Sequence, residues 1–395
     1  MNNRVFVRFC LLQGAYWAFQ AAVMGYFTAY ILDSGASVQA WGVILALNLL
    51  CAFLGTLFWG RWVDRRQASK AYFLLGNVSA LVLSCLMYFG AGHMALVAAL
   101  YPLLGFMTGA IPTVLDAWVI ASFPERREAG PRARSCATLS YAIVMLLAGQ
   151  LILRLGYGIM PVAALLSLGL SIAVALGQPE AKLSRSTAGV PEKASPRQLL
   201  SSRRYVLLVA TLFFTGMCIA PINSMKIVVL ESVGGDVALL GWDSFIGCVI
   251  QAQFLIFSKR LLKVPTGKRL AVGVIAPLCY ALLVAVARNP AMIVLGTVMN
   301  NVSFGILYPT MREMTEASVP PSLRNTAHSA VDAAYGSFSG MIATFFSGFM
   351  LRRAGAAALG FTCAGLQVVA IGCCLLLLGG RGWRKPRPAL AGSIE

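Results

Sequence analysis

Charged residues are scarce in this sequence. Only 12% of its 395 residues are Asp, Glu, Lys or Arg, whereas soluble proteins average about 25%. Hydrophobic residues make up 58% of the chain, and the mean hydropathy is +0.77. This composition excludes an ordinary soluble domain and predicts a membrane protein.

Histidine is nearly absent, since the chain contains only His93 and His328. Neither lies beside a nucleophile or within a metal-ligand pattern, and no phosphate-binding loop is present. The ten cysteines do not have metal-ligand spacing either. We therefore expect a protein that is not an enzyme, holds no metal or cofactor and does not use ATP.

Acidic residues are also few: there are 14, against 32 basic residues, and the net charge is +18. Such a charge can indicate nucleic-acid binding, but here the basic residues are divided among seven segments between apolar runs. Basic segments that alternate with membrane-crossing runs are typical of anchoring at the membrane surface. We expect contact with the lipid bilayer and no nucleic-acid partner.

Long apolar runs are what the chain has in abundance. Each is long enough to cross a hydrocarbon layer of about 30 Å, and it must do so as a helix because backbone amides find no water partner in lipid. The expected spans are 6–32, 40–60, 71–90, 94–122, 135–157, 159–177, 204–231, 238–258, 270–287, 290–316, 325–351 and 355–379. The predicted fold class is an all-α polytopic membrane protein with twelve transmembrane helices.

A polar stretch at 178–203, rich in proline, serine and charge, divides these runs into two sets of six. Such a composition is typical of a flexible linker. We expect an N-terminal half at 1–177, a C-terminal half at 204–379 and a basic tail at 380–395.

The basic residues also predict the topology. If the amino terminus is inside, most of the 32 lie in the segments on the inner side. By the positive-inside rule, both termini and the linker are then cytoplasmic, and the protein is expected in the inner (plasma) membrane.

The two halves resemble each other in sequence. Pro112 and Pro309 are 197 positions apart, as are Asp116 and Glu313. In each half the acidic residue is followed by an Ala-Ser-x-Pro run. Together with the topology, this correspondence indicates an internal duplication.

A short motif follows the second run. Positions 60–66 read Gly-Arg-Trp-Val-Asp-Arg-Arg, and Lys70 comes shortly after. This resembles the loop motif of the major facilitator superfamily, in which two six-helix repeats rock about a central site to alternate its access. Gln67 stands where the family has a second glycine, and Ala68 where it has a basic residue. The resemblance implies a transporter with a solute site near the middle of the membrane.

Other residues resemble one branch of that superfamily, which contains lactose permease, nucleoside–proton symporters and the phenylpropionate permease. They are Tyr308-Pro309, Val319-Pro320-Pro321, Leu323-Arg324, Ala327 and the acidic residue Asp116. The run 137–158 lacks the Gly-Pro signature of drug–proton antiporters. The resemblance therefore favours proton symport over efflux.

Ionisable side chains within the apolar runs cost roughly 2.5–3.5 kcal/mol each and need a partner or a function. Lys226 and Asp243 lie at similar depth on either side of the hairpin at Gly235, so we expect an ion pair. The pair either joins two helices structurally or acts in transport. In the second case Lys226 holds an anionic solute group or exchanges partners with a proton-carrying carboxylate, and Asp243 is a candidate for proton coupling.

One face of the eleventh run combines His328, Asp332, Tyr335 and Ser339. A histidine beside a carboxylate suits proton uptake and release near neutral pH, so His328 and Asp332 are candidates for proton coupling. Alternatively, His328 only satisfies the helix end near Arg324.

Asp116 and Glu313 occupy equivalent positions near the inner ends of their helices. Either they carry protons or they close a cytoplasmic gate by pairing with basic residues. Arg312 and Glu316 are four positions apart and are expected to neutralise each other. The expected gate residues are Gly60, Asp64, Arg65, Arg134 and Arg324.

An aromatic plate with amides suits a sugar ring, a nucleoside or an aromatic acid. Gln13, Trp17, Gln20 and Met24 form one stripe of the first helix, a spacing that also suits plain packing. Gln251 stands where the branch has a glutamate. Its amide is a candidate for binding a solute hydroxyl but carries no proton, so any coupling carboxylate lies elsewhere. The further candidates for solute binding are Asn223, Lys226, Asn300 and Asn301.

The sequence as a whole predicts a monomeric secondary transporter that moves a small polar organic solute by alternating access with proton symport. Proton-antiport efflux and uncoupled facilitation are the alternatives within the same fold. A lipid flippase is the alternative from a different class.

Overall fold

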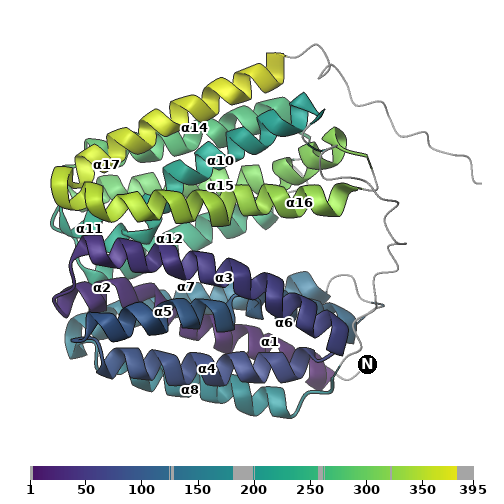
Figure 1. Cartoon of the computed structure of the whole chain (residues 1–395), viewed down its shortest axis with the longest axis vertical. Coiled ribbons are helices and arrows are strands. Elements are labelled where there is room, and N and C mark those ends of the chain that lie inside the picture. Colours follow the sequence, from purple (N-terminus) through teal and green to yellow (C-terminus); the bar gives the residue numbers. More distant parts are fainter. Residues whose placement is uncertain are drawn as a thin grey trace, which may run out of the picture.

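The computed structural model of the chain describes residues 3–123, 125, 129–180, 199, 201–256, 261, 263–320 and 323–379. All structural statements below refer to these ranges. Most of the expected linker 178–203 and the whole tail 380–395 lie outside them. The regular secondary structure of the described residues is helical, and the long helices run side by side along the molecule (Figure 1).

The first part of the chain forms six crossings. The first consists of α1 (Asn3–Phe19), the π-helical turn η1 (Gln20–Met24) and α2 (Gly25–Asp33), and the fourth consists of α5 (Met94–Thr108) and α6 (Ile111–Ser122). The unbroken ones are α3 (Val38–Arg66), α4 (Ser69–Phe89), α7 (Ala129–Leu155) and α8 (Ile159–Leu176).

The second part repeats this plan with different breaks. Its first crossing is α10 (Arg203–Ser224) with α11 (Lys226–Glu231), followed by α12 (Val237–Ile256), α14 (Thr266–Ala285) and α15 (Pro290–Ser318). The last helices are α16 (Arg324–Asp332), the π-helical turn η3 (Ala333–Phe338) and α17 (Ser339–Gly379). Inside α17, Gly355 has a φ of 78°, so the chain turns sharply there and α17 contains two crossings.

The crossings match the expected spans. Ten helical stretches of the described residues are long and apolar enough to cross a membrane. The broken first helix is a further crossing, and the turn at Gly355 divides the last stretch into two. Large apolar side chains point outward along them, as Leu166 and Leu375 do, which suits a surface in contact with lipid.

Short polar caps and prolines set the helix starts. Ser37 accepts a hydrogen bond from the backbone of Ala40 at the start of α3, and Asn289 does the same for Met292 at the start of α15. Pro290 is the first residue of α15, where its missing N–H costs nothing. These caps fix where the chain turns between crossings.

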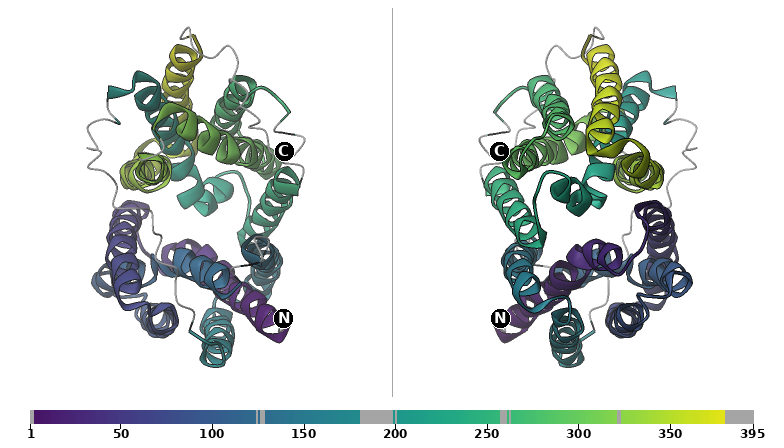
Figure 2. Two further views of the ribbon diagram at one scale, coloured as in Figure 1. Left: turned by 90° about the vertical axis from the view of Figure 1, so that its right-hand side faces the viewer. Right: turned by 90° about the vertical axis from the view of Figure 1, so that its left-hand side faces the viewer.

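The helices form two groups, which Figure 2 shows along the long axes of the helices. In the first group α1 packs on α7 and α8, α3 on α5, and α4 on α8; in the second, α17 packs on α10 and α14, and α14 on α15. Most of the contact between the groups is made by two helix pairs, α3 with α17 and α7 with α12.

One end of the bundle collects basic side chains. We call it the basic end and define it by Arg66, Arg134, Arg203, Arg269 and Arg324, which lie at or near the helix ends gathered there. The other end, at Asp33, Phe89 and Leu155, is the opposite end.

Glycines bring the two groups into backbone contact toward the opposite end. A Cβ added to Gly348 would lie 2.5 Å from the carbonyl oxygen of Val38, and one added to Gly149 would lie 2.9 Å from that of Val237. Only a residue without a side chain fits such distances. The groups are therefore held together at this end by close helix packing.

Two local features differ from the expectations. The helix α3 continues to Arg66, so the motif at 60–66 forms its last turns and is not a loop. Gln67 ends α3 in the left-handed conformation, with φ 52° and ψ 40°. The repeat is also imperfect, because the fourth crossing breaks before Pro112 whereas α15 runs unbroken through Pro309.

Candidate functional site

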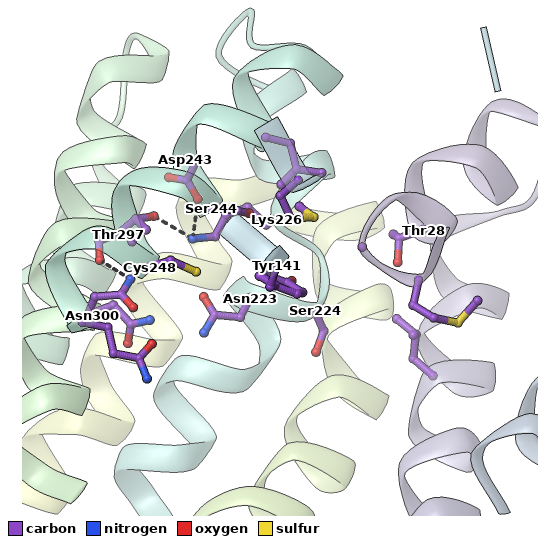
Figure 3. A pocket seen from close by; sticks show the side chains of 18 of the residues that line it. Thr28, Tyr141, Asn223, Ser224, Lys226, Asp243, Ser244, Cys248, Thr297 and Asn300 are labelled. Atoms are coloured by element: carbon purple, nitrogen blue, oxygen red, sulfur yellow. Dashed lines mark hydrogen bonds and ion pairs between the residues drawn. The ribbon is translucent and has the colours of Figure 1, made fainter. Parts of the chain in front are cut away.

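A cavity of about 460 Å³ lies between the two groups of helices (Figure 3). Met24, Thr28, Asn48 and Tyr141 line it from the first group. The second group contributes a set of polar side chains: Asn223, Lys226, Asp243, Gln251, Thr297 and Asn300. The volume suits a small organic molecule.

Two smaller cavities adjoin it. One of about 220 Å³ lies within the first group and shares Met24, Asn48 and Tyr101 with the central cavity. The other, of about 320 Å³, lies in the second group and shares Asn223, Gln251 and Asn300 among others. The shared side chains make this a single polar region that both groups line.

Lys226 lies at a break between two helices. Pro221 interrupts the hydrogen bonding of α10, and Met225 leaves helical geometry, so that α11 starts afresh at Lys226. The Lys226 Nζ lies 3.1 Å from Asp243 Oδ2 and donates to Thr297 Oγ1 at 2.6 Å. Figure 3 shows the three side chains converging at the wall of the cavity. The predicted ion pair is confirmed.

The ion pair is largely buried, and its two members differ in how many polar partners they have. The side chains of Lys226 and Asp243 are only 10% and 2% exposed. Lys226 also lies over the ring of Tyr280, 5.1 Å from its centroid. Asp243 Oδ1, by contrast, is buried and has no hydrogen-bond donor among the described residues. One carboxylate oxygen therefore lacks the partner that a buried charge needs.

Amides supply most of the remaining polarity. Of the candidates for solute binding, Asn223, Lys226, Gln251, Asn300 and Asn301 line the cavity. Asn223 Oδ1 accepts from the hydroxyl of Tyr280 at 2.9 Å. The amides of Gln251 and Asn300 line the cavity wall, where they are able to donate to and accept from a solute.

The stripe on the first helix has a different setting. Gln13 is buried and donates to Asp116 Oδ1 at 2.7 Å, and Trp17 lies under the guanidinium of Arg134, 4.7 Å from the ring centroid. Neither lines these cavities. Gln20 lines the smaller cavity of the first group and donates to the hydroxyl of Tyr16.

The other candidate carboxylates lie toward the basic end and are paired with arginines. Asp116 Oδ2 is 3.0 Å from Arg134, and Asp332 Oδ2 is 2.7 Å from Arg312. The expected pairing of Arg312 with Glu316 is wrong, because Asp332 on α16 offers Arg312 an oxygen across the helix contact. Glu316 lies 3.5 Å from His328 Nε2 instead.

Glu313 does not repeat the arrangement of Asp116. Its carboxylate pairs with Arg269 of α14 and accepts from the hydroxyl of Thr266, whereas a pairing with Arg324 was one expectation. Arg269 sits at the start of α14 with its side chain almost fully buried, which places its guanidinium beside Glu313. No feature of the repeat indicated this partner.

The expected gate residues are not joined across the two groups. Arg134 pairs within its own group, and Asp64, Arg65 and Arg324 have no ion pair among the described residues. Gly60 has no heavy atom within 4 Å of an added Cβ. Their role in a gate stays a prediction.

Sequence reasoning missed Thr297, Tyr280 and Asn48. Thr297 lies one helical turn before Asn300 and Asn301 and so shares their face of α15, a spacing that could have indicated it. Tyr280 and Asn48 carry no comparable signal, because they reach the site only through the packing of α14 and α3.

The comparisons with known proteins identify the family. A family model described as the MFS_1 like family matches residues 11–361. The chain belongs to this family and is a membrane transporter of the major facilitator superfamily, as the sequence predicted. A comparison with curated protein sequences finds no match.

Solved structures agree with this fold. A variant of the nucleoside transporter NupG aligns with a TM-score of 0.82 at 12% identity, over 94% of this chain and 99% of that chain. A bacterial homologue of the human lysosomal transporter Spinster gives 0.70 at 11% identity, over 98% and 99%. A D-xylose–proton symporter gives 0.65 at 13% identity, over 95% and 96%. The predicted all-α polytopic fold is confirmed.

Proposed function

We propose that this transporter carries a small polar organic solute, such as a sugar, a nucleoside or an organic acid, together with a proton by alternating access. The observation that carries the proposal is the Lys226–Asp243–Thr297 cluster in the wall of a cavity lined by amides from both helix groups. Solved structures with the same fold include a nucleoside transporter and a D-xylose–proton symporter, which supports this class of solute.

Asp243 is the proton carrier in this proposal. Among the described candidate carboxylates, Asp116, Glu313 and Asp332 are each paired with an arginine and do not line the central cavity. Asp243 instead faces a lysine that has a second partner in Thr297, and its Oδ1 has no donor. Protonation of Oδ1 would neutralise the Asp243 carboxylate, whose Oδ1 has no hydrogen-bond donor among the described residues.

The coupling then follows from charge balance. While Asp243 is ionised, it neutralises Lys226, and the cavity offers no net charge to a solute. Once Asp243 takes up a proton, its attraction for Lys226 falls, and the ammonium group becomes free to bind an anionic or strongly accepting group of the solute. Binding of the solute and of the proton therefore favour each other.

Solute identity is tested first. Purified protein is heated with sugars, nucleosides or carboxylates at pH 5.5 and pH 7.5, because a ligand that binds the folded state raises the unfolding temperature. We expect stabilisation by one solute class, larger at pH 5.5. The absence of any hit would count against this solute class and bring lipid or drug substrates forward.

Coupling is tested in proteoliposomes with the solute so identified. Asp243→Asn is expected to retain solute exchange but to lose accumulation driven by a pH gradient. Asp332→Asn, whose carboxylate lies outside the cavity, is the matched control and is expected to accumulate solute. If the two variants behave in the opposite way, Asp332 and not Asp243 carries the proton.

The active role of the pair is separated from a structural one by Lys226→Ala and Lys226→Ala/Asp243→Ala. A structural pair predicts that the double variant regains uptake, since no unpaired charge remains. We expect it to stay inactive because Lys226 binds the solute. We also propose that the protein works as a monomer in the inner membrane, with the basic end and both termini in the cytoplasm.

A further inference from the structure

A groove on the outer surface of the first helix group has no part in the solute site. It has a volume of about 720 Å³ and lies between α3 and α5 near the basic end. Its lining has an apolar part, formed by Leu54, Leu57, Phe58 and Phe106, and a basic part, formed by Arg61, Trp62, Arg65 and Arg66.

The lining residues of α3 form one stripe along the helix. Leu54, Leu57 and Phe58 are followed at the same helical spacing by Arg61, Trp62 and Arg65. The stripe lies to one side of the contact with the second helix group, which uses Phe53 (its ring is 5.2 Å from that of Phe338), and the residues that line the groove all belong to α3 and α5. The groove therefore faces the surrounding membrane.

The apolar part is exposed although it is large. Leu54, Leu57 and Phe58 are 47%, 43% and 54% exposed, and Phe58 contacts Phe106 at 5.6 Å between ring centroids. Such a surface suits hydrocarbon. It runs toward the end of α3, where Arg61 and Trp62 mark the level at which aromatic and basic side chains meet lipid headgroups.

The positive charges of two of these arginines are not neutralised by an ion pair among the described residues. Arg61 and Arg65 are exposed, lie one helical turn apart and have no ion pair among the described residues. Arg66 lies over the ring of Trp62 at 5.9 Å. Asp64 is the acid nearest in sequence, but it does not line the groove. Two neighbouring guanidinium groups suit one phosphate.

We propose that this groove is a binding site for an anionic phospholipid. One acyl chain lies along Leu54, Leu57 and Phe58 against Phe106, and the phosphate is held by Arg61 and Arg65. The indole of Trp62 lies between the two parts, at the level of the glycerol backbone. This site is independent of the solute cavity and of the proposed proton coupling.

A plain alternative is that the arginines only extend toward water at the membrane surface, as long basic side chains commonly do. In that case any pair of exposed arginines at the basic end would attract anionic lipid equally. Arg203 and Arg204 at the start of α10 provide this comparison, because they are adjacent, exposed and outside the groove.

The test is native mass spectrometry of the full chain in detergent with phosphatidylglycerol as the probe and phosphatidylcholine as its neutral comparison. We expect Arg61→Gln/Arg65→Gln to bind phosphatidylglycerol roughly thirtyfold more weakly, since each basic residue contributes about 1 kcal/mol near anionic lipid. Arg203→Gln/Arg204→Gln is expected to change binding little.

Two further variants keep the test sharp. Leu57→Trp fills the apolar part without changing charge and is expected to weaken binding too, whereas Arg61→Lys/Arg65→Lys keeps the charge and is expected to retain most of it. Soluble glycerol phosphate should not bind at the same concentration, because it has no acyl chain. Equal loss in both Gln pairs, equal binding of phosphatidylcholine or unchanged binding in Leu57→Trp would each overturn the proposal.

Discussion

Lys226 and Asp243 are both nearly inaccessible to solvent, and each is the other's ion-pair partner. Removing two charges from water is costly, and a well-packed apolar pair of the same volume is often at least as stable. The stability of the fold therefore does not explain why a charged pair is buried here, and a role in transport does. It also makes the two side chains strongly dependent on each other.

This dependence predicts an asymmetric effect on stability. Lys226→Met leaves the Asp243 carboxylate buried without its cation, and we expect a loss of about 3–5 kcal/mol in the free energy of unfolding. Lys226→Met/Asp243→Leu is expected to regain most of it. Unfolding of the purified protein in detergent measures both values. A single variant as stable as the double one would mean that Asp243 is neutral in the resting protein.

Gln67 is a second residue with a local cost. It is the one described residue other than glycine with a positive φ, where its Cβ approaches the neighbouring carbonyl. We expect Gln67→Gly to raise the free energy of unfolding by about 0.5–1 kcal/mol, the relief of strain less the greater entropy that glycine loses. Gln67→Ala keeps the Cβ and is the control, so an equal gain in both would show that strain is not the cause.

Among the helix contacts, the one between α10 and η3 is among the closest in the described residues. A Cβ added to Gly216 would lie 2.1 Å from the carbonyl oxygen of Tyr335 and 2.2 Å from Ser339 Oγ. The π-helical turn of η3 carries Tyr335 and Gly336 into the wall of the adjoining cavity. This contact therefore sets the position of one wall of the solute site.

Gly216→Ala is expected to separate α10 from η3 and to destabilise the protein by about 1–3 kcal/mol, as overpacking in a core does. We also expect the affinity for the transported solute to fall, which ligand-dependent thermal unfolding measures. Gly372→Ala, on α17 of the same helix group, is the matched control, because nothing among the described residues lies within 4 Å of its added Cβ and it does not line the solute cavities. Loss of affinity in both variants would point to helix propensity and not to the contact.

The helices themselves were predictable, because a membrane demands long apolar runs and charge marks their ends. The ion pair of Lys226 with Asp243 was predictable too, because a short hairpin places both at one depth. The partners of Asp332 and Glu313 were not. Arg312 and Arg269 reach them from neighbouring helices. How far each helix is rotated about its own axis decides these partners, and the hydrophobic period of the sequence does not determine that rotation.

The end of α3 likewise could be predicted only in part from the sequence. Its motif at 60–66 resembles a family loop, but the helix continues because nothing before Gln67 stops it. The absent second glycine is visible in the sequence, whereas the left-handed conformation that Gln67 must adopt is visible only in the structure.

In the whole molecule, backbone contacts between the two helix groups gather toward the opposite end, and the ion pairs near the basic end stay within each group. We infer that the structure is the state closed at the opposite end. Alternating access then requires the glycine contacts there to separate, so their tightness sets how much of this state is populated.

Gly348→Ala tests this directly. Its Cβ would meet the Val38 carbonyl oxygen at 2.5 Å, and neither backbone has room to yield without separating α3 from α17. We expect this state to be destabilised by about 1–3 kcal/mol, enough to shift the populations roughly 5- to 150-fold toward closure at the basic end. Gly365→Ala, in the other crossing of α17 and with nothing among the described residues within 4 Å of its Cβ, is the control.

Distances between spin labels report the shift in a chain whose ten native cysteines have been replaced. One pair of labels replaces Ala40 and Arg353 at the opposite end, and the other replaces Arg66 and Arg324 at the basic end. In Gly348→Ala the first distance should lengthen and the second should shorten, whereas Gly365→Ala should leave both unchanged. If only the first distance changed, the helices would be separating locally without the two groups rocking, and the glycine contacts would then act in packing alone.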